Sequence, residues 1–198
     1  MSPLPFSTAA ENNKEVIAEQ IGLNLSAPSR LLEVASGTGQ HAEFCTEKLP
    51  HIVWQPSDVE IVESRLRERV VRCGRPTLLE PIVLNIDHWP NLRPAYDGVF
   101  SANCIHIIPP HLLPKYVQGA AKSLKRGGLM MLYGPFKYGG EFTTESNLNF
   151  NQWLADRYDG AGIRDFETID ELATDNGLTF LSDQAMPANN QFIVWKKG

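Results

Sequence analysis

A glycine-rich turn with an acidic residue before it is the part of this sequence whose residue types and spacing could do chemistry. In LLEVASGTGQHAEF, residues 31–44, an apolar run contains Glu33 and is followed by Gly37 and Gly39. Glycines let a backbone turn approach a ligand closely, and the N–H groups at the start of the next helix can hold a polar or anionic group. Several unrelated chemistries use such a turn, so the surrounding elements must decide between them.

The elements that position this turn alternate between short apolar runs and helical patterns from residue 12 to about 133. This order is typical of an α/β fold with a mostly parallel sheet and helices on both faces, in which ligands bind at the carboxyl ends of the strands. We expect a helix over residues 12–25 and then five strand-helix units, with the strands RLLEV, HIVWQPSD, PIVLNID, YDGVFSANCIHII and LMMLYG. The glycine turn then follows the first strand, where a ligand would bind.

The pattern changes after the fifth strand, where PFKYGGEFTTESN predicts a loop of a length that is often functional. A later helix is expected to begin near Asp165 and Thr168, because Glu171 follows the threonine by three residues in a capping-box pattern. GLTFLSDQAM and QFIVWKK alternate in polarity around PANN, which predicts an antiparallel hairpin. Because we find no repeat or linker, we expect one domain over residues 1–198, with a helical cap over 1–26 and a lid or insert over 136–165.

Composition limits the class of protein. The chain has 198 residues and a net charge of -5, and no apolar run approaches the length of a membrane span. The basic residues are scattered apart from Arg65, Arg67, Arg69 and Arg72, which we interpret as a solvated helix face rather than a phosphate-binding surface. The three cysteines are widely spaced, and the N-terminus lacks the pattern of a secretory signal. We therefore expect a cytoplasmic monomer or homodimer that acts on a small molecule and binds neither nucleic acid nor a membrane.

Two classes of cofactor fit the glycine turn. Gly37, Gly39 and Ala42 satisfy a loose G-x-G-x-x-A pattern, and Asp58 follows at a distance suited to a ribose, so a dinucleotide is one candidate. The other candidate is S-adenosylmethionine. Glu33 favours it, because an acid four residues before the first glycine suits a cationic methionine moiety better than a pyrophosphate.

These features resemble the class I S-adenosylmethionine-dependent methyltransferases. The spacing E-x-x-x-G-x-G is similar to their first motif, LKRGGLMMLYGPF is similar to their turn before strand five, and the final hairpin is similar to their last two strands. The resemblance implies a Rossmann-like fold with a seven-stranded, mostly parallel sheet whose last strand is antiparallel. It also implies that Asp58 accepts hydrogen bonds from both ribose hydroxyls, that Asp87 meets the adenine amino group, and that S-adenosylhomocysteine is the product.

A narrower resemblance rests on FSTAAENNKEVI, EVASGTGQHAEF, WQPSD, YGPF and MPANN. These segments are similar to a small family of methyltransferase-like proteins known mainly as a domain of unknown function. This sequence departs from that family at Asn12, where Arg is expected. It departs from most class I enzymes at Ala35, which stands at the first glycine of the turn; we expect binding to survive, because one methyl fits a strand-end conformation with φ below zero.

Further candidate cofactor residues flank the turn. His41 follows it and is expected to touch the cofactor or to orient the loop. Asn13 and Lys14, on the first helix, are expected to close the pocket over the methionine carboxylate. The predicted cofactor site thus consists of Glu33, Ala35, Gly37, Gly39, His41, Asp58, Asp87, Asn13 and Lys14.

The candidates for chemistry lie later in the chain. Methyl transfer from a sulfonium is a direct displacement, so a base is needed only if the acceptor must lose a proton. His106, at the end of the fourth strand, is a candidate base or a packed histidine, and Tyr133 is a candidate substrate contact or a core residue. Asn189 and Asn190 in MPANN are either turn residues or, together with the loop over residues 137–147, part of a polar substrate lid. We expect no metal site, because the acidic residues are assigned to the cofactor.

The sequence leaves the methyl acceptor open. The first hypothesis is an S-adenosylmethionine-dependent methyltransferase that acts on a small molecule. The second is a sensor or partner protein that binds the cofactor without catalysis, because no unmistakable base or acceptor motif follows the fourth strand, where NCIHII stands. The third is a dinucleotide oxidoreductase, which nicotinamide binding would reveal.

Overall fold

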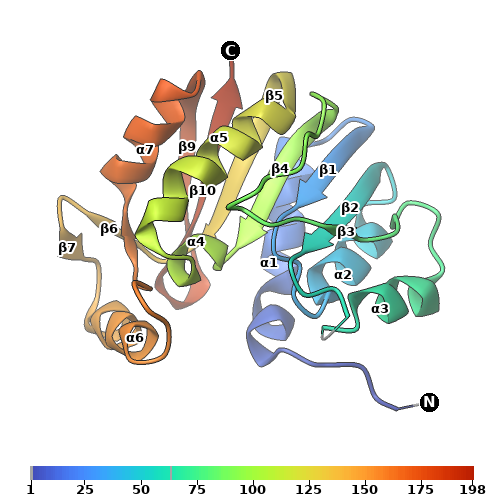
Figure 1. Cartoon of the computed structure of the whole chain (residues 1–198), viewed down its shortest axis with the longest axis horizontal. Coiled ribbons are helices and arrows are strands. Elements are labelled where there is room, and N and C mark those ends of the chain that lie inside the picture. Colours follow the sequence, from blue (N-terminus) through green and yellow to red (C-terminus); the bar gives the residue numbers. More distant parts are fainter. Residues whose placement is uncertain (1, 63) are drawn as a thin grey trace.

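A seven-stranded sheet runs through the centre of the protein and has helices on both faces (Figure 1). The computed structural model describes residues 2–62 and 64–198. The strands of this sheet are β1 (Ser29–Glu33), β2 (Ile52–Asp58), β3 (Ile82–Val83), β4 (Tyr96–Ala102), β5 (Leu124–Gly134), β9 (Leu178–Met186) and β10 (Asn190–Lys197). Their order is β3-β2-β1-β4-β5-β10-β9. The first five strands are parallel, and β10 is antiparallel to both of its neighbours, which confirms the predicted fold class.

The helices are α1 (Thr8–Asn24), α2 (Gln40–Lys48), α3 (Leu66–Cys73), α4 (Cys104–Ile107), α5 (Leu113–Ser123), α6 (Glu145–Ala155) and α7 (Phe166–Asp175), with 3-10 turns η1 (Pro110–Leu112) and η2 (Pro187–Asn189). The helices form one layer on each face of the sheet, and the segment between β5 and α7 forms an extension that contains α6. The extension also holds a small sheet, in the order β7-β6-β8, made of β6 (Phe136–Tyr138), β7 (Glu141–Phe142) and β8 (Arg164–Asp165). Among the described residues, none of these helices has the length and apolar character needed to cross a membrane.

Neighbouring residues of the central strands belong to different cores. Leu32 and Val99 pack with α5 and α7 on one face of the sheet, whereas Leu31 and Phe100 pack with α1 and α2 on the other. This alternation follows from the two-residue period of a strand. It explains why the parallel strands read as continuous apolar runs, because both of their faces are covered.

Three predictions about the elements need correction. Between β3 and β4 the described residues form turns rather than the expected helix. The fourth strand ends at Ala102, because Asn103 adopts a left-handed conformation with φ 56° and α4 begins directly after it. The helix α7 begins directly after Asp165, in agreement with the expected start, but Thr168 and Glu171 lie inside the helix and form no capping box.

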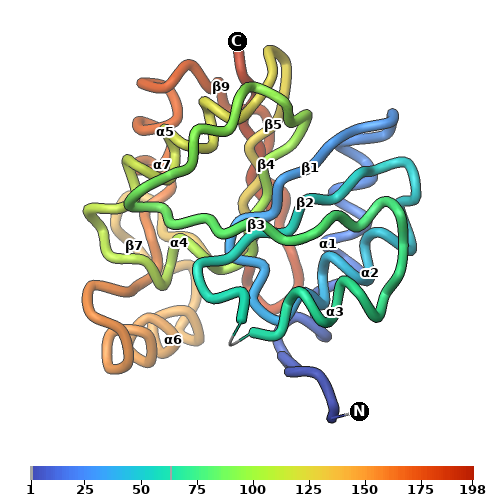
Figure 2. Tube along the Cα trace, turned by 45° about the vertical axis from the view of Figure 1, so that its right-hand side comes forward, coloured from blue at the N-terminus to red at the C-terminus, as the bar shows by residue number. Residues whose placement is uncertain are grey.

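The carboxyl ends of β1, β2, β4 and β5 meet at one edge of the sheet, the lower edge in Figure 1. The start of β10 lies at the same edge because this strand runs antiparallel to β5. Figure 2 shows the N-terminal segment and α1 passing this edge from the side of α2 and α3. Residues from five distant parts of the sequence are thereby brought together.

Candidate functional site

The glycine turn joins β1 to α2 and is bonded to the end of β2. Gly37 N donates a hydrogen bond to Asp58 Oδ2 at 2.7 Å, and Ser36 N donates to Ser57 O at 2.8 Å. Gly37 has φ 52°, a left-handed value that glycine adopts without strain. A Cβ atom on Gly37 would meet nothing within 4 Å, so the turn borders open space where a ligand can approach.

These residues fit an adenosyl cofactor. Asp58 Oδ1 also accepts a bond from Glu60 N at 3.2 Å, yet a carboxylate has about four acceptor positions and retains capacity for ribose hydroxyls. Gly39 is the N-cap of α2, so the N-terminus of a nine-residue helix faces the turn. The turn, the carboxylate and the helix end together supply the acceptors and donors that such a group needs.

Ala35 departs from the predicted conformation. Its φ is 59°, not below zero, so this exposed alanine occupies the left-handed region that costs an L-residue roughly 1–2 kcal/mol. The turn therefore keeps the backbone shape of a glycine while carrying a methyl group.

Glu33 lies beneath the turn rather than at its surface. Its side chain is buried, Oε2 accepts a bond from Trp54 Nε1 at 2.9 Å, and burial raises the pKa of its carboxyl to about 7. Oε1 lies 3.8 Å from His41 Nδ1, and His41 Nε2 donates to Asn13 Oδ1 at 2.7 Å. Burial lowers the pKa of His41 to about 4. A polar chain therefore connects the strand below the turn with α1.

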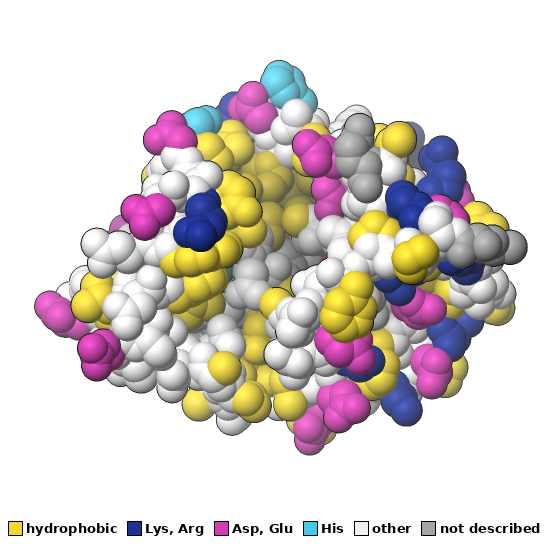
Figure 3. Space-filling model, turned by 90° about the horizontal axis from the view of Figure 1, so that it is seen from below, with side chains coloured by type: hydrophobic (Ala, Val, Ile, Leu, Met, Phe, Trp, Pro, Cys, Tyr) yellow, Lys and Arg dark blue, Asp and Glu magenta, His cyan; other side chains and the backbone are white. Residues whose placement is uncertain are grey.

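A cavity of about 420 Å³ opens beside the turn, at the hollow visible in Figure 3. Its walls come from α1, the residue after β4, the end of β5, the start of α6 and the η2 turn. Its polar lining consists of Tyr133, Ser146 and six asparagines: Asn12, Asn13, Asn103, Asn147, Asn189 and Asn190. Four of the predicted residues, Asn13, Tyr133, Asn189 and Asn190, thus meet in one place.

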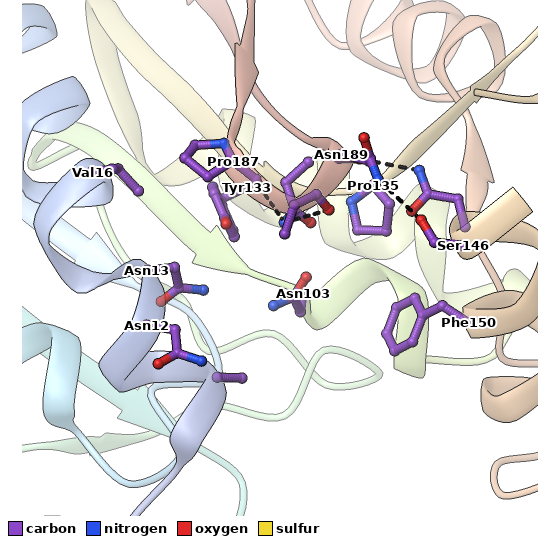
Figure 4. Close-up of a pocket in the computed structure, with 14 residues that line it drawn as sticks. Asn12, Asn13, Val16, Asn103, Tyr133, Pro135, Ser146, Phe150, Pro187 and Asn189 are labelled. Carbon is purple, nitrogen blue, oxygen red and sulfur yellow. Dashed lines mark hydrogen bonds between the residues drawn. The ribbon is translucent and has the colours of Figure 1, made fainter. Parts of the chain in front are cut away.

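Asn103 and Tyr133 form the floor of this cavity. Asn103 N donates to Tyr133 O at 2.8 Å, and Figure 4 shows the Asn103 side chain between α1 and Phe150. Burial raises the pKa of Tyr133, although hydrogen bonds with the Asn13 and Asn190 side chains oppose this shift. The Tyr133 hydroxyl consequently stays protonated at neutral pH and is a hydrogen-bond donor.

The wall opposite α1 is a bonded unit made of the MPANN turn and α6. Asn147 Nδ2 donates to Asn189 O at 3.1 Å, and Asn189 Nδ2 donates to Ser146 Oγ at 3.0 Å (Figure 4). Ala188 and Asn189 have φ 57° and 58°, which explains why a turn-forming amide occurs here. The polar-lid alternative for MPANN is consistent with these contacts, and its partner is the start of α6.

Comparison with known proteins places this fold and site in a family. A family model described as "Protein of unknown function (DUF938)" matches residues 4–197. The chain belongs to this family. The DUF938 chain has the fold of class I methyltransferases, which confirms the fold that the broader resemblance implied.

Three solved structures illustrate the likeness of the DUF938 fold. An O-methyltransferase family protein from Burkholderia thailandensis gives a TM-score of 0.81 at 14% identity, over 96% of this chain and 56% of its own. Human N-acetylserotonin methyltransferase, solved in complex with SAM, gives a TM-score of 0.74 at 15% identity. The match covers 96% of this chain and 53% of the human chain. A protein described as a sarcosine dimethylglycine methyltransferase from Galdieria sulphuraria gives a TM-score of 0.76 at 17% identity. The match covers 96% of this chain and 87% of the Galdieria chain. The chain spans about half the length of the first two.

Two predicted cofactor residues lie apart from this group in the DUF938 structure. Asp87 forms an ion pair with Lys115, which lowers the pKa of its carboxyl, and lines a separate cavity with Trp89. Lys14 pairs with Glu11 and lies over the Phe44 ring, 4.9 Å from its centre, on the outer side of α1. Neither side chain lines the cavity that holds Asn13 and Tyr133.

His106 also lies outside the cavity lining, and it belongs to α4 rather than to β4. Its ring is fully buried, neither nitrogen has a hydrogen-bond partner in the part of the chain that the structure describes, and burial lowers its pKa to about 3. A Cβ atom on Gly134 would lie 2.3 Å from His106 Nε2, so the ring sits directly behind that glycine. Its role as a base stays a prediction.

Arg69 corrects the interpretation of the arginine group as a solvated face. It is 9% exposed and donates to Thr38 O in the glycine turn, to Pro5 O in the N-terminal segment and to the Glu43 carboxylate. Arg65 donates to Pro3 O at 2.7 Å from the same helix. The spacing of the four arginines does not predict that Arg69 contacts both Thr38 O and Pro5 O. Through these two bonds Arg69 connects the N-terminal segment to the glycine turn.

The sequence predicts part of the cavity. Ser146 and Asn147 fall within the loop over residues 137–147 that is expected to join the polar lid, whereas Asn12 is distinguished only by its departure from a resemblance and Asn103 carries no prediction. A signal existed for Asn103, because an asparagine directly after an apolar strand often adopts the left-handed turn that ends it. No spacing pattern marks Asn147, which reaches the site through its contact with Asn189.

Proposed function

We propose that this protein is an S-adenosylmethionine-dependent methyltransferase that acts on a small molecule. The observation that carries the proposal is the bond between Gly37 and Asp58 at the same edge of the sheet as an asparagine-lined cavity, since this edge then offers a cofactor turn and room for an acceptor. The methyltransferase fold of its structural neighbours supports it. We also propose that DUF938 is the family of methyltransferase-like proteins that the segments FSTAAENNKEVI and MPANN resemble.

The cofactor would be held by residues at the strand ends. Gly37 and Gly39 would admit it, Asp58 would accept bonds from its ribose, and Asn13 would meet its methionine end together with Tyr133. Contact between Asp87 and adenine would require the ion pair with Lys115 to open, so this assignment stays a proposal. The bound cofactor supplies an activated methyl group with a good leaving group.

The chain's own residues would orient the acceptor and exclude water. Tyr133 would offer its protonated hydroxyl to the acceptor at the floor of the cavity, and Asn103 would offer an amide at its centre. We propose that residues 1–26 act as a cap and residues 136–165 as a lid within one domain, because α1 and α6 form opposite walls. The same proposal includes a cytoplasmic location, with which the three free described cysteines agree. It also includes a small-molecule partner, a monomeric or homodimeric state, and no binding to nucleic acid or a membrane.

Calorimetric titration of the purified chain tests this function. We expect S-adenosylhomocysteine to bind with one site per chain and reduced nicotinamide dinucleotide to show no heat. Binding of the dinucleotide instead would favour an oxidoreductase and overturn the proposal.

A second function, cofactor binding without catalysis, is favoured by one observation. Among the described residues, no histidine or carboxylate lines the cavity, so no side chain there has a pKa suited to a general base. Incubation with isotope-labelled S-adenosylmethionine and a metabolite extract separates the two. Labelled product indicates an enzyme, whereas tight binding with no transfer indicates a sensor.

A further inference from the structure

The cavity beside the glycine turn is lined without ionic groups. Of the described side chains that line it, none belongs to Asp, Glu, Lys, Arg or His. Its polar surface is supplied by the six asparagines with Tyr133 and Ser146, and Phe150 adds an aromatic surface. In Figure 3 the charged side chains lie around the hollow rather than in it. A charged ligand would therefore lose its water without gaining a counter-ion, which is costly.

The two histidines behind the lining add no positive charge at neutral pH. His41, behind Asn13, and His106, behind Gly134, both have pKa values lowered by burial, to about 4 and about 3. Burial raises the pKa of Tyr133, so its hydroxyl is neutral as well. An anionic acceptor such as a carboxylate or a phosphate would meet no cationic side chain in the lining.

The wall made by α6 and the MPANN turn contains two side-chain amides whose N–H groups are already bonded. Asn147 and Asn189 both use their amide N–H groups for bonds to protein oxygens. In the described part of the chain, no protein donor reaches either side-chain carbonyl oxygen. A ligand that satisfies these oxygens must carry N–H or O–H donors.

The reacting atom must supply its own lone pair. An aliphatic amine is an ammonium ion at neutral pH, and a phenol has a pKa near 10, so both need a base that the lining does not provide. A neutral ring nitrogen of the imidazole or pyridine type keeps an unprotonated lone pair at this pH. Phe150, whose ring points from α6 toward Asn103 in Figure 4, offers such a ring a flat neighbour.

We propose, on the basis of the proposed function, that the cavity takes an uncharged aromatic nitrogen heterocycle bearing an amide or amino donor, and that a ring nitrogen accepts the methyl group. The ring nitrogen forms the new N–C bond with its lone pair, the S–C bond breaks with its electron pair going to sulfur, and the positive charge moves from sulfur to the ring. Where a second ring nitrogen carries a proton, that proton leaves to water. The cationic product is poorly matched to the neutral lining and is released.

The first experiment measures binding of three matched pairs to the full chain, with and without saturating S-adenosylhomocysteine. The pairs are nicotinamide and nicotinate, pyrazinamide and pyrazinoate, and imidazole-4-carboxamide and imidazole-4-carboxylate. Each pair shares its ring and differs in charge and in N–H donors. We expect at least one carboxamide to bind at least tenfold more tightly than its carboxylate. Equal or tighter binding of the carboxylates, or no carboxamide binding while the homocysteine product binds, overturns the inference.

The second experiment identifies the acceptor atom by mass spectrometry after incubation with S-adenosylmethionine. The bound carboxamide is expected to gain a methyl group on its ring nitrogen, whereas benzamide, which lacks that nitrogen, should bind without being methylated. Methylation of catechol or tyramine in place of the heterocycles overturns the assignment. If the chain binds no S-adenosyl compound at all, the proposed function fails, while the matched pairs measured without cofactor still decide the charge preference of the cavity.

A charge placed in the lining gives a third readout. Asn12→Asp adds a carboxylate at an exposed position of the wall, and Gln20→Glu adds the same charge on α1 outside the cavity. We expect the first variant to bind the cation 1-methylnicotinamide at least threefold more tightly than the native chain, and the second to leave binding unchanged. Equal effects of the two variants would show that the lining does not select charge.

Discussion

Gly37 N and Asp58 Oδ2 lie 2.7 Å apart, so the glycine turn is bonded to the end of β2 before any ligand arrives. The Asp58 carboxylate thus holds the turn in place and can still accept further hydrogen bonds. The turn is also bonded on its other side, where Arg69 reaches Thr38 O. Several testable consequences depend on this arrangement.

Replacement of Ala35 by glycine should stabilise the protein. Ala35 has φ 59° and is exposed, so the variant removes left-handed strain without removing a contact. Glycine increases the entropy of the unfolded chain, which offsets part of the gain, and we expect about 1 kcal/mol in urea denaturation. The control is Ala188→Gly, whose φ of 57° predicts a similar gain at a position far from the turn. A loss of stability in Ala35→Gly would contradict the left-handed conformation.

Replacement of Gly134 by alanine should destabilise the protein strongly. The added Cβ would lie 2.3 Å from His106 Nε2, and the glycine has φ 153°. Overpacking of this kind costs roughly 1–3 kcal/mol. Gly140→Ala, which meets nothing within 4 Å, is the control and should cost less in the same denaturation series. Equal effects would mean that His106 does not pack against Gly134.

Replacement of Arg69 by methionine should loosen the N-terminal segment. The variant removes bonds to Pro5 O and to Thr38 O, so limited proteolysis should cleave before α1 faster and cofactor affinity should fall several-fold. Arg67→Met, at an exposed position paired with Glu80, is the matched control and should change neither. If both variants behave alike, Arg69 does not connect the segment to the turn.

Glu33 should make stability depend on pH. Burial raises its folded-state pKa to about 7, above its unfolded value, so its contribution is fully present below about pH 4.5 and is lost as the pH rises through 7. Unfolding free energies of the native chain and Glu33→Gln, measured from pH 4.5 to 8, should therefore diverge with increasing pH, by on the order of 2–3 kcal/mol. His41 acts in the opposite direction: burial lowers its pKa to about 4, so its contribution is lost as the pH falls toward 4. Parallel curves for the two proteins would exclude a raised pKa at Glu33.

The fold was predictable because its signals are local. Gly37, Gly39 and the apolar strands fix a parallel α/β sheet through spacing alone, and the hairpin around PANN was visible as two alternating runs. The cavity was less predictable because it is assembled by long-range contacts: Asn147 reaches Asn189 across 42 positions. Asp87 shows the limit of resemblance, since its sequence position after the third strand did not reveal that Lys115 would take its carboxylate.

The affinity of Asp58 variants for S-adenosylhomocysteine, measured by calorimetry, tests the central proposal most directly. Asp58→Ala removes the charged acceptor from the turn and the ribose site, so we expect at least a tenfold loss of affinity. Asp58→Asn keeps an acceptor for Gly37 N and should lose less, while Asp183→Ala, on the exposed edge strand β9, should bind as the native chain does. Unchanged affinity in Asp58→Ala would contradict the cofactor site.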